Sequence, residues 1–457
     1  MTAIKFETIG NATLIVYENN SPLIASDAWF DTEQAYFGSW RLSHKVPIKQ
    51  RESIEKAKYI FISHFHPDHL NVPSLRHCKK STIIIAQHYG NRVEKDLRNI
   101  GFNVLALPSR KWISIGKRTR IMLFNNEGQD SAMLIELTDD GGEKSLLLNL
   151  NDSGGFGFEK EVALISKKYK NSFYLQLHGW GDSDMINLFN EKGTRIEPLA
   201  AKKFPVGRDI KSGLKKFNAN IAIPFSCFHQ YQRRDSYWAN KYATPAQMMS
   251  EGFIEEEDYI LLPAFQVVEL KKGTFISRNI NPEKLEIIEP VHESEFGDDW
   301  DECLSEKEIK ACIDYFQSIT TLFKNYKSII LSVGGTDHEM LHKTNGSAIL
   351  RFSVPRTSLL KAVRREIFDD LLIGNFMKTQ IKVGRTLYDP DFNYTVTKYS
   401  DNGRAKDTNE LHKYFKYYNH NRKKRDIFAK FYMENRRTLL GFLGNNLRTR
   451  VKYLMRK

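Results

Sequence analysis

Three imidazoles and one carboxylate stand within six positions of each other, at His64, His66, Asp68 and His69. They directly follow the apolar run 59–62, which has the length and composition of a buried strand. Side chains two positions apart on an extended backbone point the same way, so His64 and His66 can bind one metal ion together. Pro67 then favours a turn, which leaves the other two side chains free to hold a second ion nearby.

The alternative interpretation of this segment is structural. A single histidine at the end of a strand is usually just hydrogen-bonded to its neighbours. Four potential ligands in the pattern H-x-H-x-D-H, directly after a strand, argue against coincidence. The motif therefore predicts a metal site at one end of a strand.

The motif and its surroundings resemble the metallo-β-lactamase fold superfamily. The resemblance rests on residues 64–71, Gln129-Asp130-Ser131, 148–152, Pro224-Phe225 and 368–374. Within the superfamily, the chain is most similar to the CMP-N-acetylneuraminate hydroxylase-like branch. It is less similar to the N-acylphosphatidylethanolamine phospholipase D-like and ascorbate-phosphate lactonase-like branches. The resemblance implies an α/β fold of the αββα sandwich type, with one or two divalent metal ions as cofactors, zinc first and iron or manganese as alternatives.

The superfamily pattern also implies where further site residues lie. An early aspartate that supports the motif is matched by Asp27, which follows a hairpin expected over residues 13–25. The bridging carboxylate, at the end of a later strand, is matched by Asp152, and the last histidine by His229. The metal ligands that the resemblance implies are thus His64, His66, Asp68, His69, Asp152 and His229.

One position departs from the superfamily pattern. Asn126 stands where a third histidine for the first ion is expected. An amide is a poor ligand for Zn²⁺ but suits a harder ion that is bound mainly by oxygen. Glu127 and Asp130 are neighbours that could substitute for it. The first site could therefore hold zinc, iron or manganese, or stay empty.

Metal-assisted hydrolysis is the leading functional hypothesis. A metal ion lowers the pKa of bound water toward neutrality, and the hydroxide attacks an ester, amide or phosphodiester. Asp68 would orient this nucleophile. His178, after an apolar run, is a second catalytic candidate, with strand capping as its structural alternative. Arg233 and Arg234 would bind an anionic small-molecule substrate if they lay over the metals, and would otherwise be surface arginines.

Two other classes of function stay open. A His/carboxylate site with one imidazole missing also suits a non-haem iron oxygenase that acts on a sugar or nucleotide-sugar. The four cysteines show no C-x-H…C-x-x-H arrangement for a Rieske centre, so electrons would have to come from a separate partner. The third hypothesis is a non-catalytic binding protein.

The chain of 457 residues is long enough for more than one domain. Residues 1–285 hold the strand-rich pattern and every candidate ligand, and residues 286–400 read as an α+β extension. Few and scattered cysteines, no leader pattern at the first residues and no long apolar run predict a cytoplasmic protein.

Residues 401–457 form a strongly basic segment. They carry 16 Lys and Arg against 5 Asp and Glu, a net charge of +11 out of +13 for the chain. An apolar helical stripe runs beside basic residues between 440 and 454. Such a tail could make peripheral contact with an anionic membrane or polyanion, with nucleic acid as a weaker alternative. Alternatively, the stripe packs on the protein itself. The sequence does not indicate an oligomeric state.

Overall fold

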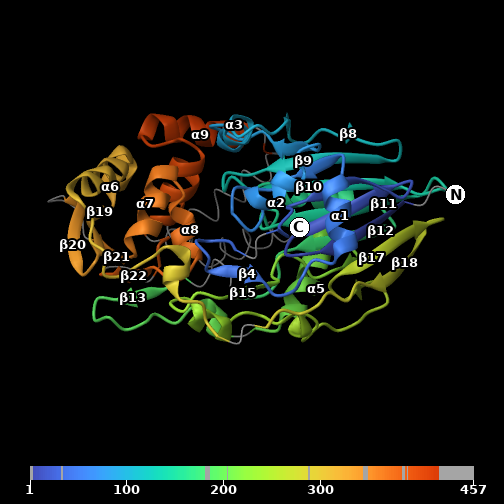
Figure 1. The fold of residues 1–457 in the computed structure, drawn as a ribbon. Helices are drawn as coiled ribbons and strands as arrows, with labels where there is room; N and C mark the ends of the chain where they lie inside the picture. Colours follow the sequence, from blue (N-terminus) through green and yellow to red (C-terminus); the bar gives the residue numbers. More distant parts are fainter. Residues whose placement is uncertain are drawn as a thin grey trace, which may run out of the picture.

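Two β-sheets packed face to face form the larger part of the protein (Figure 1). The computed structural model describes residues 4–31, 34–180, 186–202, 204–286, 289–342, 348–382, 386–388, 390–420 and 422. The first sheet has the order β18 (Thr274–Asn279), β17 (Gln266–Lys271), β1 (Ile4–Ile9), β2 (Thr13–Glu18), β3 (Ser21–Ser26), β5 (Tyr59–Phe61), β6 (Thr82–Ala86) and β7 (Val104–Leu107). The second has the order β16 (Ile260–Leu261), β14 (Ile221–Ala222), β12 (Asn171–Gln176), β11 (Lys144–Asn151), β10 (Ser131–Thr138), β9 (Thr119–Asn125) and β8 (Ile113–Ser114).

Helices cover the outer face of each sheet. Those on the first sheet are α1 (Ile48–Lys56), α2 (Val72–His77) and α3 (Arg92–Asn99), which contribute to one hydrophobic cluster with β5 and β6. Those on the second sheet are α4 (Glu159–Ser166) and α5 (Val206–Phe217), which share a cluster with β11 and β12. A third cluster lies between the sheets and joins Phe6 and Phe61 to Ile121 and Phe173. The predicted αββα sandwich is confirmed.

The alternation of buried side chains explains why these segments are strands. In β11 and β12 nearly every residue is buried, because helices cover one face and the first sheet covers the other. β18, at the edge of the first sheet, alternates between exposed and half-buried residues instead. Two short antiparallel strands, β4 (Trp40–Leu42) and β15 (His229–Tyr231), pair apart from the large sheets.

The C-terminal part forms a separate core around a five-stranded sheet (Figure 1). The sheet has the order β13 (Leu188–Asn190), β22 (Lys378–Ile381), β21 (Ala348–Ser353), β19 (Tyr326–Val333) and β20 (Thr336–His342). Its helices are α6 (Glu306–Ser318), α7 (Arg356–Arg365), α8 (Phe368–Ile373) and the π-helix η6 (Tyr394–Asn402). Short 3₁₀ turns are η1 (Leu199–Lys202), η2 (Tyr237–Lys241), η3 (Ala246–Met248), η4 (Glu293–Phe296) and η5 (Thr320–Lys324). β13 comes from within the predicted first domain, so the C-terminal sheet uses a strand from before residue 285.

The start of the predicted basic tail packs on the sandwich. Helix α9 (Thr408–His420) buries Tyr414 and Tyr418. The Tyr418 hydroxyl lies 2.9 Å from His88 Nδ1, and the Tyr414 hydroxyl donates to the Glu127 carbonyl at 2.5 Å. The predicted apolar stripe between 440 and 454 lies outside the described residues. In the part of the chain that is described, no helix is both long and apolar enough to cross a bilayer.

Arg92, at the start of α3, ties the sandwich to the C-terminal part. Its guanidinium donates to the Glu366 carbonyl at 2.7 Å, the Arg365 carbonyl at 2.5 Å and Asn402 Oδ1 at 2.9 Å. The same group lies 4.1 Å from the centre of the Phe65 ring, one residue from two of the motif histidines. The motif loop is therefore held directly against the C-terminal part.

Asp401 predicts a pH dependence of stability at this junction. Burial, opposed by the charge of Arg92, raises the pKa of Asp401 to about 7, and its carboxylate accepts from the Tyr315 hydroxyl and the Phe368 amide. Because the pKa of Asp401 is higher in the folded protein than in the unfolded chain, protonated Asp401 stabilises the fold. This contribution to the free energy of unfolding is complete below the unfolded pKa of about 3.9 and is lost as the pH rises through 7. We expect the free energy of unfolding of Asp401→Asn to fall less steeply than that of the wild type over this pH range. Denaturant unfolding of both proteins between pH 4 and 8 measures it, and parallel pH curves would contradict the assignment.

Candidate metal centre

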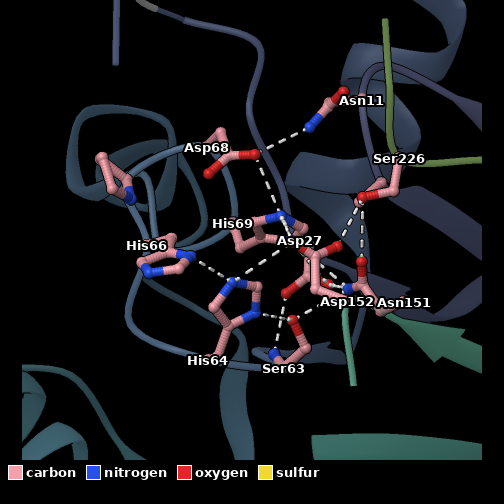
Figure 2. Close-up of polar contacts among 12 residues, drawn as sticks. Asn11, Asp27, Ser63, His64, His66, Asp68, His69, Asn151, Asp152 and Ser226 are labelled. Atoms are coloured by element: carbon pink, nitrogen blue, oxygen red, sulfur yellow. Dashed lines mark hydrogen bonds and ion pairs between the residues drawn. The ribbon is translucent and has the colours of Figure 1, made fainter. Parts of the chain in front are cut away.

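The carboxyl ends of three strands meet at one edge of the sandwich. β3 and β5 are parallel neighbours, so Asp27 and Ser63, which follow them, emerge side by side, and the Ser63 amide donates to Asp27 Oδ1 at 2.8 Å. Asp152 follows β11 in the facing sheet, and Asn151 beside it donates to Ser63 Oγ at 2.9 Å. Figure 2 shows these residues converging on the imidazoles of the motif loop.

Two histidines and one carboxylate offer a first set of donor atoms. His64 Nε2 lies 2.8 Å from His66 Nδ1 and 3.8 Å from Asp152 Oδ2 (Figure 2). One ligand atom from each of these three residues lies within 4.8 Å of the others. His64 and His66 therefore direct one nitrogen each to the same place, as their spacing of two residues predicted.

A second set of donor atoms shares the same carboxylate. His69 Nε2 lies 3.0 Å from Asp68 Oδ2 and 3.6 Å from Asp152 Oδ2. Oδ2 of Asp152 thus faces both His64 and His69, as a bridging ligand would. His69 is fully buried, and its Nε2 faces the carboxylates of both Asp68 and Asp152. A buried imidazole nitrogen that converges with two carboxylates is a donor arrangement that fits a metal ion.

The nitrogens that point away from the centre all have partners. His64 Nδ1 lies 2.9 Å from Ser63 Oγ, and His69 Nδ1 lies 3.4 Å from Asp27 Oδ2. His66 Nε2 lies 2.7 Å from Asp369 Oδ2, on α8 of the C-terminal part. Metal-binding histidines typically use their second nitrogen in this way, which fixes the ring and its tautomer.

Side-chain donors orient both carboxylates. Asp68 accepts from the Tyr36 hydroxyl at 2.6 Å and from Asn11 Nδ2 at 2.9 Å. Asp152 Oδ1 accepts from Ser226 Oγ at 2.9 Å, which leaves Oδ2 turned toward the histidines. Each carboxylate is thus positioned by residues from outside the motif.

Strained backbone gathers around the centre. Asp27, Tyr36, Asn151 and Ser226 all have φ between 42° and 65°, a left-handed conformation that costs a residue other than glycine about 1–2 kcal/mol. Asn151 lies beside a break in the β11–β12 register, and its conformation turns Asp152 out of the strand toward the motif. Such strain persists where the surrounding structure fixes it, typically at functional sites.

The pKa values of the four central groups are shifted in different directions. Burial, and then the charges of His69 and His66, lower the pKa of His64 well below its usual value. Burial opposes ionisation of Asp68, but the charge of His69 outweighs it and lowers the Asp68 pKa to about 2. Burial would likewise lower the pKa of His69, yet Asp68 and Asp152 raise it well above normal. Desolvation raises the pKa of Asp152 to about 6. These shifts favour a positively charged His69 beside an ionised Asp68, and His69 must lose a proton before Nε2 can act as a ligand.

Two predicted site histidines, His178 and His229, make contacts outside the two donor sets. His229, on β15, stacks on Trp40 with ring centres 3.5 Å apart, and it borders a cavity of about 940 Å³. Trp40 in turn borders a cavity of about 20 Å³ next to His66 and Asp152. His178 is buried against the Tyr174 ring, and burial lowers its pKa to about 3.

The residues near the expected third histidine serve other contacts. Asn126 Oδ1 accepts from the Gly128 amide within the β9–β10 turn, and Glu127 forms an ion pair with Arg422. Asp130 interacts electrostatically with His66 and His69 of the centre. Burial raises its pKa, while the charges of Lys398 and His66 oppose this.

The two arginines predicted for substrate binding are paired with carboxylates. Arg233 is fully buried, with Nη1 2.7 Å from Asp298 Oδ2 and Nη2 2.8 Å from Asp235 Oδ2. Arg234 is 57% exposed and pairs with Glu293 at 2.5 Å. This geometry gives Arg233 a structural role.

Several site residues were not identified from the sequence. Asn11, Tyr36 and Ser226 are ordinary polar residues in loops, Asn151 is the last residue of β11, and no spacing signal marked any of them. Asp369 lies in the segment 368–374 that carried part of the family resemblance, which was its only signal. Lys398 had none.

Comparison with known proteins agrees with this geometry. Residues 24–138 match the sequence model of the beta-lactamase superfamily domain, so the resemblance to the metallo-β-lactamase fold superfamily is confirmed. The chain is 28% identical over 120 residues to cytidine monophosphate-N-acetylneuraminic acid hydroxylase of Danio rerio. This match covers 24% of the chain and 20% of the relative, so the chain spans about a fifth of the length of that protein.

Solved structures resemble the fold at low identity. CmlA, a diiron β-hydroxylase from Streptomyces venezuelae, is 11% identical with a TM-score of 0.37, covering 59% of this chain and 54% of its own. The isothiocyanate hydrolase from Delia radicum gut bacteria is 12% identical with a TM-score of 0.34, covering 57% of this chain and 98% of its own.

Proposed function

We propose that this protein is a metal-dependent hydrolase that acts on an ester, amide or phosphodiester. The observation that carries the proposal is the orientation of the three motif histidines. In each of them, one ring nitrogen faces the donor sets around Asp152. The other ring nitrogen has a partner of its own, which is Ser63 for His64, Asp369 for His66 and Asp27 for His69. This is the arrangement that metal-binding imidazoles need.

The donor sets divide between two ions. His64, His66 and Asp152 would hold one ion, and Asp68 and His69 would hold the other with Asp152 shared. When bound, the ions supply a water of lowered pKa and positive charge for the developing oxyanion.

The chain's own groups would prepare this reaction. Asp68, fixed by Tyr36 and Asn11, would orient the attacking water by accepting a hydrogen bond from it. Ser226 keeps Asp152 in its bridging orientation. Tyr36 and Ile373, together with Trp40, enclose the small cavity beside the ligands and limit entry of bulk water.

A non-haem iron oxygenase is the second candidate. His64, His66 and Asp152 make a set of two histidines and one carboxylate, which is the usual donor set of non-haem iron oxygenases. The curated relative named above is a hydroxylase, which supports the same candidate. The four cysteines form no disulfide and lack the spacing of a Rieske centre, so an oxygenase would take its electrons from a separate partner protein.

Metal analysis combined with reconstitution tests the proposal. The purified protein is analysed for metals, stripped with a chelator, and reloaded with Zn²⁺ or Fe²⁺ before assay against nitrophenyl esters, anilides and bis(nitrophenyl) phosphate. Zinc-restored hydrolysis supports the hydrolase. Iron occupancy with oxygen consumption and no hydrolysis favours the oxygenase, and failure to bind any metal contradicts both.

A further inference from the structure

Two side chains from the C-terminal part reach the metal centre. Asp369, on α8, and Lys398, on η6, are separated from His66 by more than 300 residues, yet both contact its Nε2. The distances are 2.7 Å from Nε2 to Asp369 Oδ2 and 3.2 Å from Nε2 to Lys398 Nζ. Lys398 Nζ also lies 3.1 Å from the same carboxylate oxygen. The three side chains are each about nine-tenths buried, so they form a closed triad.

The two partners make opposite demands on Nε2. An ionised carboxylate can only accept a hydrogen bond, and an ammonium group can only donate one. A neutral imidazole carries one N–H, so Nε2 either donates to Asp369 or accepts from Lys398. The shorter contact is with Asp369, and the ammonium is engaged by the same carboxylate. Nε2 of His66 therefore carries the proton.

This choice decides whether His66 can act as a ligand. With the proton on Nε2, Nδ1 has a free lone pair, and Nδ1 is the atom that faces His64 Nε2 at 2.8 Å. If Lys398 donated to Nε2 instead, the proton would sit on Nδ1 and block it. The carboxylate thus selects the tautomer that can bind a metal ion.

We propose that Asp369 and Lys398 form a C-terminal clamp, in which Asp369 fixes His66 in its metal-binding tautomer and Lys398 holds Asp369 in place. The inference rests on the metal centre of the proposed function and assigns two positioning residues to it. The C-terminal part would then be required for full metal affinity, although the motif itself lies in the sandwich.

Metal affinity in the full-length protein tests the clamp. Zn²⁺ binding is measured by chelator competition for Asp369→Asn, Lys398→Met and the double variant. Asp369→Asn should bind about 10–100-fold more weakly, because a neutral amide competes poorly with the ammonium for Nε2. Lys398→Met should lose less than about tenfold, since the tautomer is kept. The double variant should recover affinity relative to Asp369→Asn, because the competing donor is gone.

Asp401→Asn is the matched control, because Asp401 is equally buried and anchors the same helix without contacting His66. It should bind Zn²⁺ as the wild type does. Absorption bands of the Co²⁺-loaded protein give a second readout, which should change in Asp369→Asn and stay constant in Asp401→Asn. Wild-type affinity in Asp369→Asn, or a double variant no better than the single one, would overturn the clamp.

Lys398→Met keeps the test decisive if Asp369→Asn does not fold. A loss beyond about tenfold in Lys398→Met alone would contradict the tautomer argument. The outcome is also separable from the proposed function. A wild type that binds zinc without hydrolysing any substrate leaves the clamp standing, whereas an active hydrolase with unchanged affinity in Asp369→Asn refutes only the clamp.

Discussion

Asp152→Asn should abolish most of the activity and remove the tight binding of at least one metal ion. Asp152 Oδ2 faces both His64 Nε2 at 3.8 Å and His69 Nε2 at 3.6 Å, so both donor sets depend on it. Asparagine has the same shape and can still accept from Ser226, but its neutral amide is a weak metal ligand. We expect turnover to fall at least about 100-fold, or about 2.7 kcal/mol in transition-state stabilisation. His69→Ala should have a similar effect.

The measurements are metal stoichiometry and turnover of the purified variants, with His88→Ala as the control. His88 lies between the Tyr418 hydroxyl at 2.9 Å and Ser131 Oγ at 2.7 Å, so both of its ring nitrogens have partners outside the two donor sets. Its loss should lower the free energy of unfolding while metal content stays at the wild-type level. Full stoichiometry and turnover in His69→Ala would show that the ions are not held at this centre.

The central histidines of the site could be predicted from the sequence, because their geometry depends only on neighbouring residues. His64 and His66 follow directly from a strand, so period two alone places their rings together. The turn that brings His69 back to the centre is equally local, since the His69 amide donates to the His66 carbonyl at 3.0 Å. Asp152 could be found only by resemblance, because its place depends on how β11 faces the first sheet.

The groups around the motif depend on long-range packing, which leaves no periodic signal. Tyr36 and Asn151 act through left-handed backbone conformations that their residue types do not reveal. Asp369 and Lys398 reach His66 only after a second core has folded against the first. The role of Arg233 also depends on long-range packing, because a cation beside aromatic residues looks the same in sequence whether it meets a ligand or the carboxylates of Asp235 and Asp298.

The fold was predictable to a similar depth. The family resemblance implied the αββα sandwich, and the buried strand predicted at 59–62 corresponds to β5 of the structure. The assignment of β13 to the C-terminal sheet was not predictable. A three-residue strand has too few positions for a pattern, and its partner β22 is nearly 200 residues away.

Arg233→Met should destabilise the protein by about 3–5 kcal/mol. The guanidinium is fully buried and donates to Asp235 with Nε at 2.9 Å and Nη2 at 2.8 Å, and to Asp298 with Nη1 at 2.7 Å. It also lies 4.0 Å from the centre of the Phe376 ring. Methionine would fill part of the volume but leave a buried carboxylate at Asp298 without its counter-charge, which is the costly way to break an ion pair.

Arg234→Met is the matched control, because the side chain of the neighbouring arginine is 57% exposed whereas that of Arg233 is fully buried. We expect it to change the free energy of unfolding by less than about 1 kcal/mol. Denaturant unfolding of the two variants gives the comparison, and the Michaelis constant of each, once a substrate is found, gives an independent readout. If Arg233→Met unfolded like the wild type but bound an anionic substrate more weakly, Arg233 would be a substrate ligand, and its burial in the ion-pair network would not describe its working role.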